Sequence, residues 1–121
     1  MSDPRHELGR RAEDAAATWL TQLGWRVMAR RWRSAAGEID LICADQGGTL
    51  VAVEVKLRRT DRTGSALEAL DARRLPRLRG ALADYAREST HHWAALRIDL
   101  VAATPAGDGW RLVRLAAVDA W

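Results

Sequence analysis

Cysteine and histidine are scarce in this 121-residue sequence, which has one cysteine and three histidines. Cys43 has no second cysteine to pair with, so the sequence excludes an intramolecular disulfide and a cysteine-rich zinc site. Stability must therefore come from ordinary burial of side chains. The 48% of residues that are hydrophobic suffice for one core, so we expect a single domain over residues 1–121.

Long hydrophobic runs are also missing. No apolar segment approaches the roughly 20 residues that a membrane helix needs, and 29% of the residues are charged. Residues 1–11 mix both charge signs and no continuous apolar segment follows them, so we expect no signal peptide. The sequence therefore predicts a cytoplasmic protein with no membrane partner.

Lysine is nearly absent, because Lys56 is the only lysine among 19 basic residues and all the others are arginine. Arginine is always charged and planar, whereas lysine is compact and can give up a proton. A single retained lysine is typical of a position where these properties matter, although one residue can also be retained by chance.

Positive charge is concentrated between residues 56 and 79, which hold eight basic and three acidic side chains and so carry +5. The net charge of the chain is +3, so the remainder carries −2. Such a segment can bind a polyanion. The alternative is a solvated, arginine-rich face. The basic residues are Lys56, Arg58, Arg59, Arg62, Arg73, Arg74, Arg77 and Arg79.

Hydrophobic periodicity and turn residues predict seven elements. They are a helix over 6–24, strands over 25–32, 38–43 and 49–57, a helix from the capping box at 65–68 toward Glu88, and strands over 94–103 and 110–118. Pro76 predicts a kink or a restart before Leu78, because proline disrupts a helix beyond its first turn. The order α-β-β-β-α-β-β indicates an α/β fold with a mixed sheet flanked by helices.

The turn at residues 46–48 predicts the register of the hairpin around it. A three-residue loop makes the numbers of paired residues sum to 94, so Asp40 lies opposite Glu54 and Glu38 lies opposite Lys56. These four polar side chains then share one face of the hairpin. The other face carries Ile39, Leu41, Cys43, Val51, Val53 and Val55.

Two carboxylates that face each other across a strand pair repel unless a cation compensates them. Mg²⁺ or Mn²⁺ fits, because one or two carboxylates with water and a phosphate complete its shell. Lys56 lies two positions from Glu54 and can orient or deprotonate a metal-bound water, which is the chemistry of phosphodiester hydrolysis. The alternative is that these residues form ordinary cross-strand ion pairs.

These residues resemble the active-site pattern of the PD-(D/E)xK nucleases. Within that superfamily the sequence is similar to the YraN-type bacterial proteins, which are themselves similar to archaeal Holliday-junction resolvases. The resemblance implies a restriction-endonuclease-like fold, Asp40 and Glu54 as metal ligands, Lys56 as the catalytic lysine and Glu13 as a helix-borne acid. It covers residues 7–101 and rests on Leu8-Gly9, Glu13, Gly24-Trp25, Arg33, Gly37 to Ile42, Val53 to Lys56, Arg58, Glu68-Ala69 and Arg97 to Asp99.

The sequence departs from that pattern at several positions. Ile39 stands where the superfamily name implies proline, Arg31 where the family usually has asparagine, and Arg73 where it favours lysine. Ala12 and Ala52 replace the usual glycine and phenylalanine. None of these changes removes a proposed ligand, although Arg31 in place of an amide can alter substrate contacts.

The sequence therefore predicts a metal-dependent, nuclease-like domain that hydrolyses DNA, with branched or recombination-intermediate DNA as a candidate substrate and Mg²⁺ or Mn²⁺ as the cofactor. The alternative is a catalytically inactive adaptor that binds nucleic acid through the same basic surface. The oligomeric state stays open, with a homodimer as one option. The residues expected to contact DNA are Arg58, Arg59, Arg62, Arg73, Arg74 and Arg77.

Overall fold

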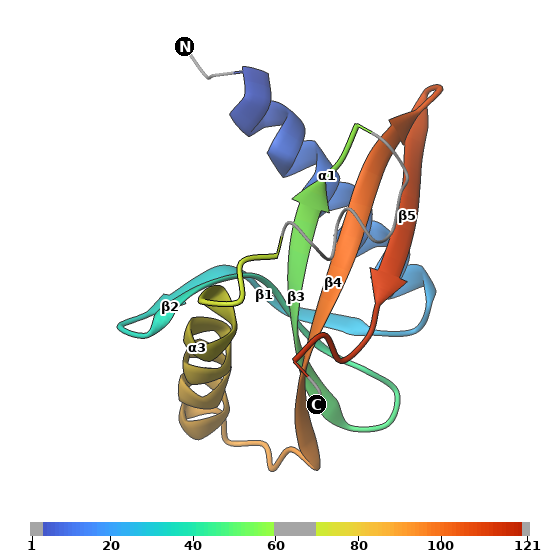
Figure 1. The fold of residues 1–121 in the computed structure, drawn as a ribbon. Coiled ribbons are helices and arrows are strands. Elements are labelled where there is room, and N and C mark those ends of the chain that lie inside the picture. The colour runs from blue at the N-terminus through green and yellow to red at the C-terminus, as the bar shows by residue number, and fades with distance from the viewer. Residues whose placement is uncertain (1–3, 60–69, 120–121) are drawn as a thin grey trace.

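The computed structural model describes residues 4–59 and 70–119 and has the predicted order of elements (Figure 1). The capping box at 65–68 lies outside the described residues. The elements are α1 (Pro4–Gln22), β1 (Arg26–Ser34), β2 (Gly37–Ala44), β3 (Thr49–Leu57), α3 (Arg74–Glu88), β4 (Ala95–Ala106) and β5 (Gly109–Leu115).

One five-stranded sheet, in the order β1-β2-β3-β4-β5, organises the fold. Neighbouring strands are antiparallel except for β3 and β4, which run parallel and are joined by the connection that contains α3. The sheet is therefore mixed, as the sequence predicted. It ends at β1 on one side and at β5 on the other.

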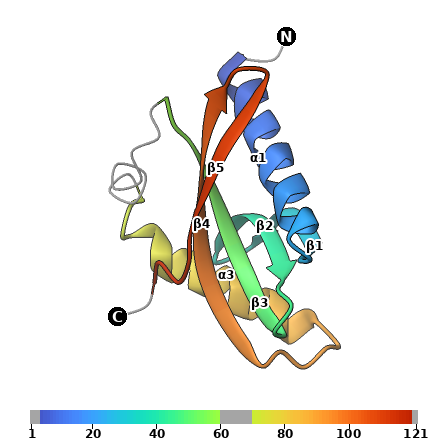
Figure 2. The ribbon, with the colours of Figure 1, turned by 90° about the vertical axis from the view of Figure 1, so that its right-hand side faces the viewer.

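Helices α1 and α3 cover opposite faces of the sheet (Figure 2). Successive residues of a strand point to opposite faces, and β3 shows this clearly. Val51 and Val53 pack in one buried cluster with Leu20 of α1. Leu50 and Ala52 pack in another with residues of α3, and both clusters are almost wholly inaccessible to solvent.

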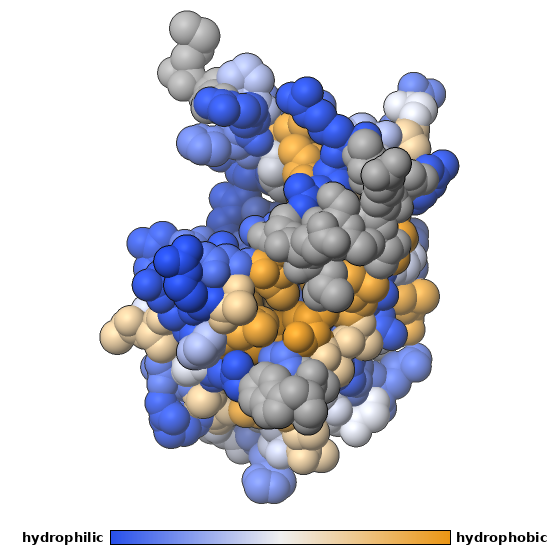
Figure 3. All heavy atoms as spheres, in the orientation of Figure 1, coloured by the Kyte–Doolittle hydropathy of each residue, from blue (hydrophilic) through white to orange (hydrophobic). Residues whose placement is uncertain are grey.

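A third, smaller cluster extends the core over β4 and β5. Leu100 and Ala102 are buried there against Leu115 and Val118. Figure 3 shows hydrophobic residues gathered near the middle of the molecular face that Figure 1 presents, beside α3, with hydrophilic residues around them. None of the described helices is long and apolar enough to cross a membrane.

The register predicted for the β2–β3 hairpin is confirmed where the two strands pair. The pairs run from Ala44 opposite Leu50 to Leu41 opposite Val53, and each sums to 94. The ladder stops there, because β2 turns away from β3 beyond Leu41. The predicted pairing of Glu38 with Lys56 is therefore wrong.

Glu38 pairs with β1 instead of β3. It lies opposite Arg33, whose Nη2 is 2.7 Å from Glu38 Oε2. The strict alternation predicted for β2 also fails at Ile39, which packs in the cluster under α3, while Leu41 packs under α1. The change of direction therefore falls at Asp40, between these two residues.

Helix α3 begins at Arg74, so Pro76 falls in its first turn. A proline there removes no intrahelical hydrogen bond, because the first backbone N–H groups of a helix have no acceptor within it. The described helix therefore begins ahead of Leu78, and Pro76 introduces no kink within it.

Two glycines let α3 approach the β1–β2 turn closely. A Cβ placed at Gly80 would lie 3.0 Å from the Cβ of Ala36, and one at Gly37 would lie 3.3 Å from the Cβ of Arg77. Both distances are shorter than ordinary van der Waals contact. The contact fixes α3 beside the end of β3 that carries the candidate site.

Candidate metal and nucleic-acid site

Asp40 lies where β2 and β3 separate. Its Oδ2 accepts a hydrogen bond of 2.9 Å from the backbone N–H of Val55. The carboxylate thus takes the place of a missing β2 carbonyl, so the split in the sheet leaves this buried N–H satisfied. The same geometry keeps the Asp40 side chain beside that of Glu54, although the predicted strand pairing of these two residues is not formed, because the ladder ends at Leu41 and Val53.

Glu54 is 3% exposed, and its surroundings favour the protonated form. The pKa of Glu54 is raised from its ordinary value of 4.5 to about 9, chiefly by burial and also by a hydrogen bond with Asp40 and the Asp40 charge, against the opposing charges of Arg74 and Lys56. Glu54 therefore holds a proton near neutral pH.

Arg74 supplies the nearest described positive charge to Glu54. Its Nη2 lies 2.9 Å from Glu54 Oε2. The contact is an ion pair without hydrogen-bond geometry, since this buried oxygen receives no hydrogen bond from any described residue. A buried carboxylate oxygen with no donor is poorly satisfied by protein groups alone.

Lys56 follows on β3, opposite Ala102 of β4. It is half-buried and shares the α3 face of the strand with Glu54, because the two residues are separated by one position. Its positive charge lowers the pKa of Glu54, which places the ammonium in the electrostatic field of the carboxyl pair. The structure thus places Lys56 near Glu54, and its predicted catalytic role stays a prediction.

Glu13 reaches the site from α1. Burial raises its pKa above the ordinary value; a hydrogen bond from Arg31 opposes this, and the charge of Asp40 adds to it. Arg31 Nε lies 3.1 Å from Glu13 Oε1. The structure therefore places Glu13 within the electrostatic range of Asp40, and no described contact joins it to Glu54 or Lys56.

Sequence reasoning did not anticipate how Arg31 takes part. It is one of two non-glycine residues with positive φ in the described part of the chain, at 49°. Asparagine adopts this conformation more readily than arginine, which accounts for the asparagine that the YraN-type pattern has here. The left-handed backbone ends the alternation of β1, so Arg30 and Arg31 both reach α1, at Asp14 and Glu13. The only sequence signal is that departure from the pattern.

The carboxylate pair offers part of a metal site. In the described ranges, 4–59 and 70–119, no three Asp, Glu, His or Cys side chains gather closely enough to hold an ion. Mg²⁺ and Mn²⁺ can bind through one or two carboxylates when water and a phosphate complete the shell. The unsatisfied Glu54 oxygen beside Asp40 fits this requirement.

The arginines expected to contact DNA occupy different settings. Arg59, Arg73 and Arg77 are exposed, Arg58 is half-buried, and Arg62 lies outside the described residues. Arg74 is paired with Glu54. The sequence analysis did not select the four exposed arginines of β1, although a run of basic residues marks that strand. They are Arg26, Arg30, Arg31 and Arg33.

A second charged cluster is structural. Asp99 is fully buried and accepts hydrogen bonds from Arg97 Nε (2.8 Å) and Arg114 Nη1 (2.9 Å). Arg97 also bonds to Asp45 beside the β2–β3 turn, and both guanidinium groups lie over the Trp25 ring. The cluster ties β4, β5 and that turn together, and its charges balance.

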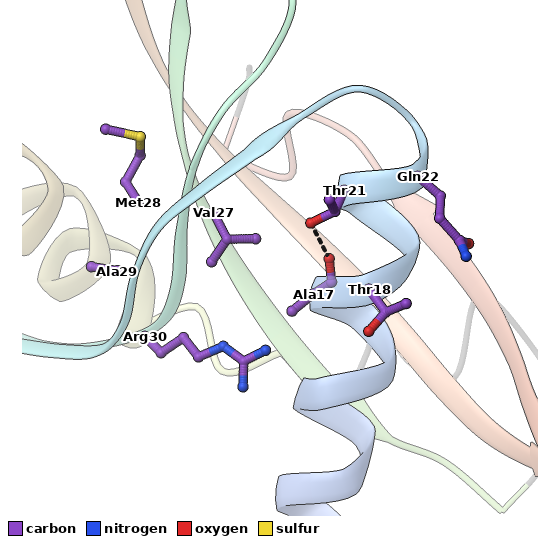
Figure 4. Close-up of a pocket in the computed structure, with 8 residues that line it drawn as sticks. All are labelled: Ala17, Thr18, Thr21, Gln22, Val27, Met28, Ala29 and Arg30. Carbon is purple, nitrogen blue, oxygen red and sulfur yellow. Dashed lines mark hydrogen bonds between the residues drawn. The ribbon is translucent and has the colours of Figure 1, made fainter.

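A groove between α1 and β1 is separate from this site (Figure 4). Thr21 Oγ1 donates to the carbonyl of Ala17 within it, and Arg30 is paired with Asp14. None of the predicted catalytic residues lines it. Its walls are formed by Ala17, Thr18, Thr21, Gln22, Val27, Met28, Ala29 and Arg30.

Fold and site together define a mixed α/β domain with a buried Glu54 and a partly buried Asp40 beside one lysine. A family model described as "Uncharacterised protein family UPF0102" matches residues 12–103, and the chain belongs to this family. A UPF0102 protein of Mycolicibacterium vanbaalenii is 42% identical over 100 residues, which cover 83% of this chain and 82% of the relative. One of Rhodococcus opacus is 44% identical over 95 residues, 78% and 80% of the two chains. The match confirms the resemblance to the YraN-type proteins.

Proposed function

We propose that the protein is a metal-dependent endonuclease of the cytoplasm that hydrolyses DNA phosphodiesters, with branched DNA as the candidate substrate. The observation that carries the proposal is the buried Glu54, with an unsatisfied oxygen, beside the partly buried Asp40 and next to the only lysine of the chain. A pair of carboxyl groups at a split in the sheet costs stability and adds nothing to the core, which favours a functional role.

Each residue has a distinct part in this chemistry. Asp40 and Glu54 would hold Mg²⁺ or Mn²⁺, which supplies charge neutralisation and an acidified water. Lys56 can accept or return a proton beside the phosphate, which arginine cannot do near neutral pH. Glu13 adds a third carboxylate at the margin of the site. The exposed Arg73 and Arg77 of the α3 region would hold the DNA backbone by phosphate contacts.

Cleavage of linear, single-stranded, flapped and four-way DNA with Mg²⁺ and with Mn²⁺ tests the proposal. Asp40→Asn is a better probe than Asp40→Ala, because the amide oxygen can still accept the N–H of Val55. We expect Asp40→Asn and Glu54→Gln to abolish cleavage while the fold is retained, as measured by circular dichroism.

Lys56→Arg separates catalysis from binding. Arginine keeps the charge, so DNA and metal affinity should stay close to wild type, while the cleavage rate falls by about 10²–10⁴, the usual effect of losing acid–base assistance. Equal cleavage rates for Lys56→Arg and wild type would show that Lys56 contributes only its positive charge.

The second candidate function is a nucleic-acid-binding adaptor without catalysis. It is favoured by the ion pair of Arg74 with Glu54, which partly compensates the carboxyl pair without a metal. Binding of DNA with no cleavage under any of the metals and substrates above, and with no effect of Asp40→Asn on affinity, would support the adaptor.

A further inference from the structure

Arg74 is placed differently from its neighbours on α3. Arg73 is 90% exposed and pairs with Asp71, two positions away in sequence. Arg74 is the first residue of the helix, and its guanidinium turns inward to Glu54, which is 3% exposed. Arg74 thus points into the carboxylate site, whereas Arg73 and Arg77 are exposed to solvent.

The position that Arg74 takes is the one a cation would use. Its Nη2 lies 2.9 Å from Oε2, the carboxylate oxygen that receives no hydrogen bond from the described residues. An arginine that belonged permanently to this site would be expected to form a directed hydrogen bond, as Arg97 and Arg114 do with the buried Asp99. The contact with Glu54 is electrostatic and undirected.

Arg74 also has an open path away from the site. Its side chain is 39% exposed, so it borders solvent at its present position. Once outward, it would join Arg73 and Arg77 on the surface where phosphate contacts are proposed. A guanidinium binds a phosphate oxygen at least as well as a carboxylate.

We propose that Arg74 is an exchangeable counter-ion of the Asp40–Glu54 site. A divalent cation displaces it from Glu54, and the released guanidinium then contacts a DNA phosphate, so that metal and DNA binding strengthen each other through this side chain. The inference rests on the proposed metal site and adds to it a coupling between the two ligands. Thermodynamic linkage requires the coupling to be equal in both directions.

Calorimetric titration with Mn²⁺ in the absence of DNA tests the displacement. Arg74→Gln should bind Mn²⁺ about threefold to tenfold more tightly than wild type, because a competing positive charge is gone. Arg73→Gln is the matched control, since it removes the same charge one residue away and should leave Mn²⁺ affinity unchanged. Arg74→Lys keeps a competing charge and should fall between wild type and Arg74→Gln.

DNA affinity tests the second step. In a Lys56→Gln background, which limits cleavage, the affinity for four-way DNA is measured without metal and with Mn²⁺. The gain in affinity caused by Mn²⁺ should shrink when Arg74→Gln is added. Arg73→Gln should weaken DNA binding in both conditions and preserve the gain.

The outcomes separate this inference from the proposed function. If Mn²⁺ binding is lost in Asp40→Asn but is equal in wild type, Arg74→Gln and Arg73→Gln, the metal site stands and the role of Arg74 is overturned. An Mn²⁺-dependent gain in DNA affinity that survives Arg74→Gln also overturns it. If Mn²⁺ binds to none of these proteins, the proposed metal site itself fails.

Discussion

Glu54 links the stability of the fold to pH. Between its ordinary pKa of 4.5 and its folded value of about 9, the folded protein holds a proton that the unfolded chain releases. The free energy of unfolding contributed by this group is therefore fully present below 4.5 and is lost as the pH rises toward 9, by at most about 1.4 kcal/mol per pH unit.

Chemical denaturation of metal-free protein across this pH range measures the effect. Glu54→Gln keeps a neutral side chain at every pH, so its stability should exceed that of wild type by a margin that grows with pH. Glu38→Gln is the control on the same sheet, because Glu38 is partly exposed and paired with Arg33. Parallel pH profiles for wild type and Glu54→Gln would contradict the prediction.

The backbone of Arg31 predicts a stabilising substitution. A non-glycine residue in the left-handed region lowers stability by roughly 1–2 kcal/mol, and the loss is smaller for asparagine than for arginine. The ion pair that would be lost joins a half-exposed Arg31 to Glu13 and contributes at most about 1 kcal/mol. We therefore expect Arg31→Asn to raise the melting temperature or leave it unchanged.

Arg33→Asn provides the comparison for that measurement. Arg33 lies on the same strand with an ordinary negative φ and also loses one ion pair when replaced. It should lower the melting temperature slightly. A loss with Arg31→Asn as large as that with Arg33→Asn would show that the left-handed backbone carries no cost here.

At the level of the elements, two helical glycines respond oppositely to the same substitution. Alanine normally stabilises a helix interior by about 1 kcal/mol relative to glycine. Gly9 of α1 has nothing within 4 Å of an added Cβ, so Gly9→Ala should show this gain. At Gly80 the added Cβ would meet Ala36 at 3.0 Å, so Gly80→Ala should lose it by pushing α3 from the β1–β2 turn. Thermal unfolding of the two variants tests this, and equal gains would mean that the turn moves freely.

The elements themselves were predictable because their patterns are local. The alternation Val51, Val53, Val55 and the turn at 46–48 fix β3 and its register without knowledge of the rest of the chain. The separation of β2 from β3 at Asp40 was not predictable, because the alternation of polar and apolar residues continues unbroken from Glu38 to Leu41. The pairing of Glu38 with Arg33 follows from the same separation.

The site was predictable in part for a similar reason. The register points Asp40 toward Glu54 even though the ladder ends one pair before them, and one position of spacing puts Lys56 on the same face as Glu54. The contact of Arg74 with Glu54 was not visible in the sequence, since it joins residues on different elements through the packing of α3. The sequence also predicts that Arg74 contacts DNA, and that contact stays a prediction.

On the scale of the whole molecule, a net charge of +3 and exposed arginines at the start of α3 predict DNA binding that weakens steeply with salt. With six to ten phosphate contacts, raising the salt concentration from 50 to 200 mM would lower DNA affinity by a factor of about 10³–10⁵. Arg73→Glu with Arg77→Glu should weaken binding and flatten this slope. Arg87→Glu, at the other end of the same helix, should change it little. Fluorescence anisotropy at several salt concentrations gives the DNA affinity and its dependence on salt. An affinity that does not change with salt would contradict an electrostatic origin of binding.

Because Lys56 is the only lysine, chemical labelling of its amine reports on the candidate site. Amine-reactive reagents have one side-chain target, Lys56, besides the α-amino group, and that target is half-buried next to the carboxyl pair. The rate of acetylation at Lys56, read by mass spectrometry from one peptide, therefore measures how accessible the site is. Bound DNA should slow that labelling and leave labelling of the α-amino group unchanged, so occupancy can be followed in protein that performs no cleavage at all.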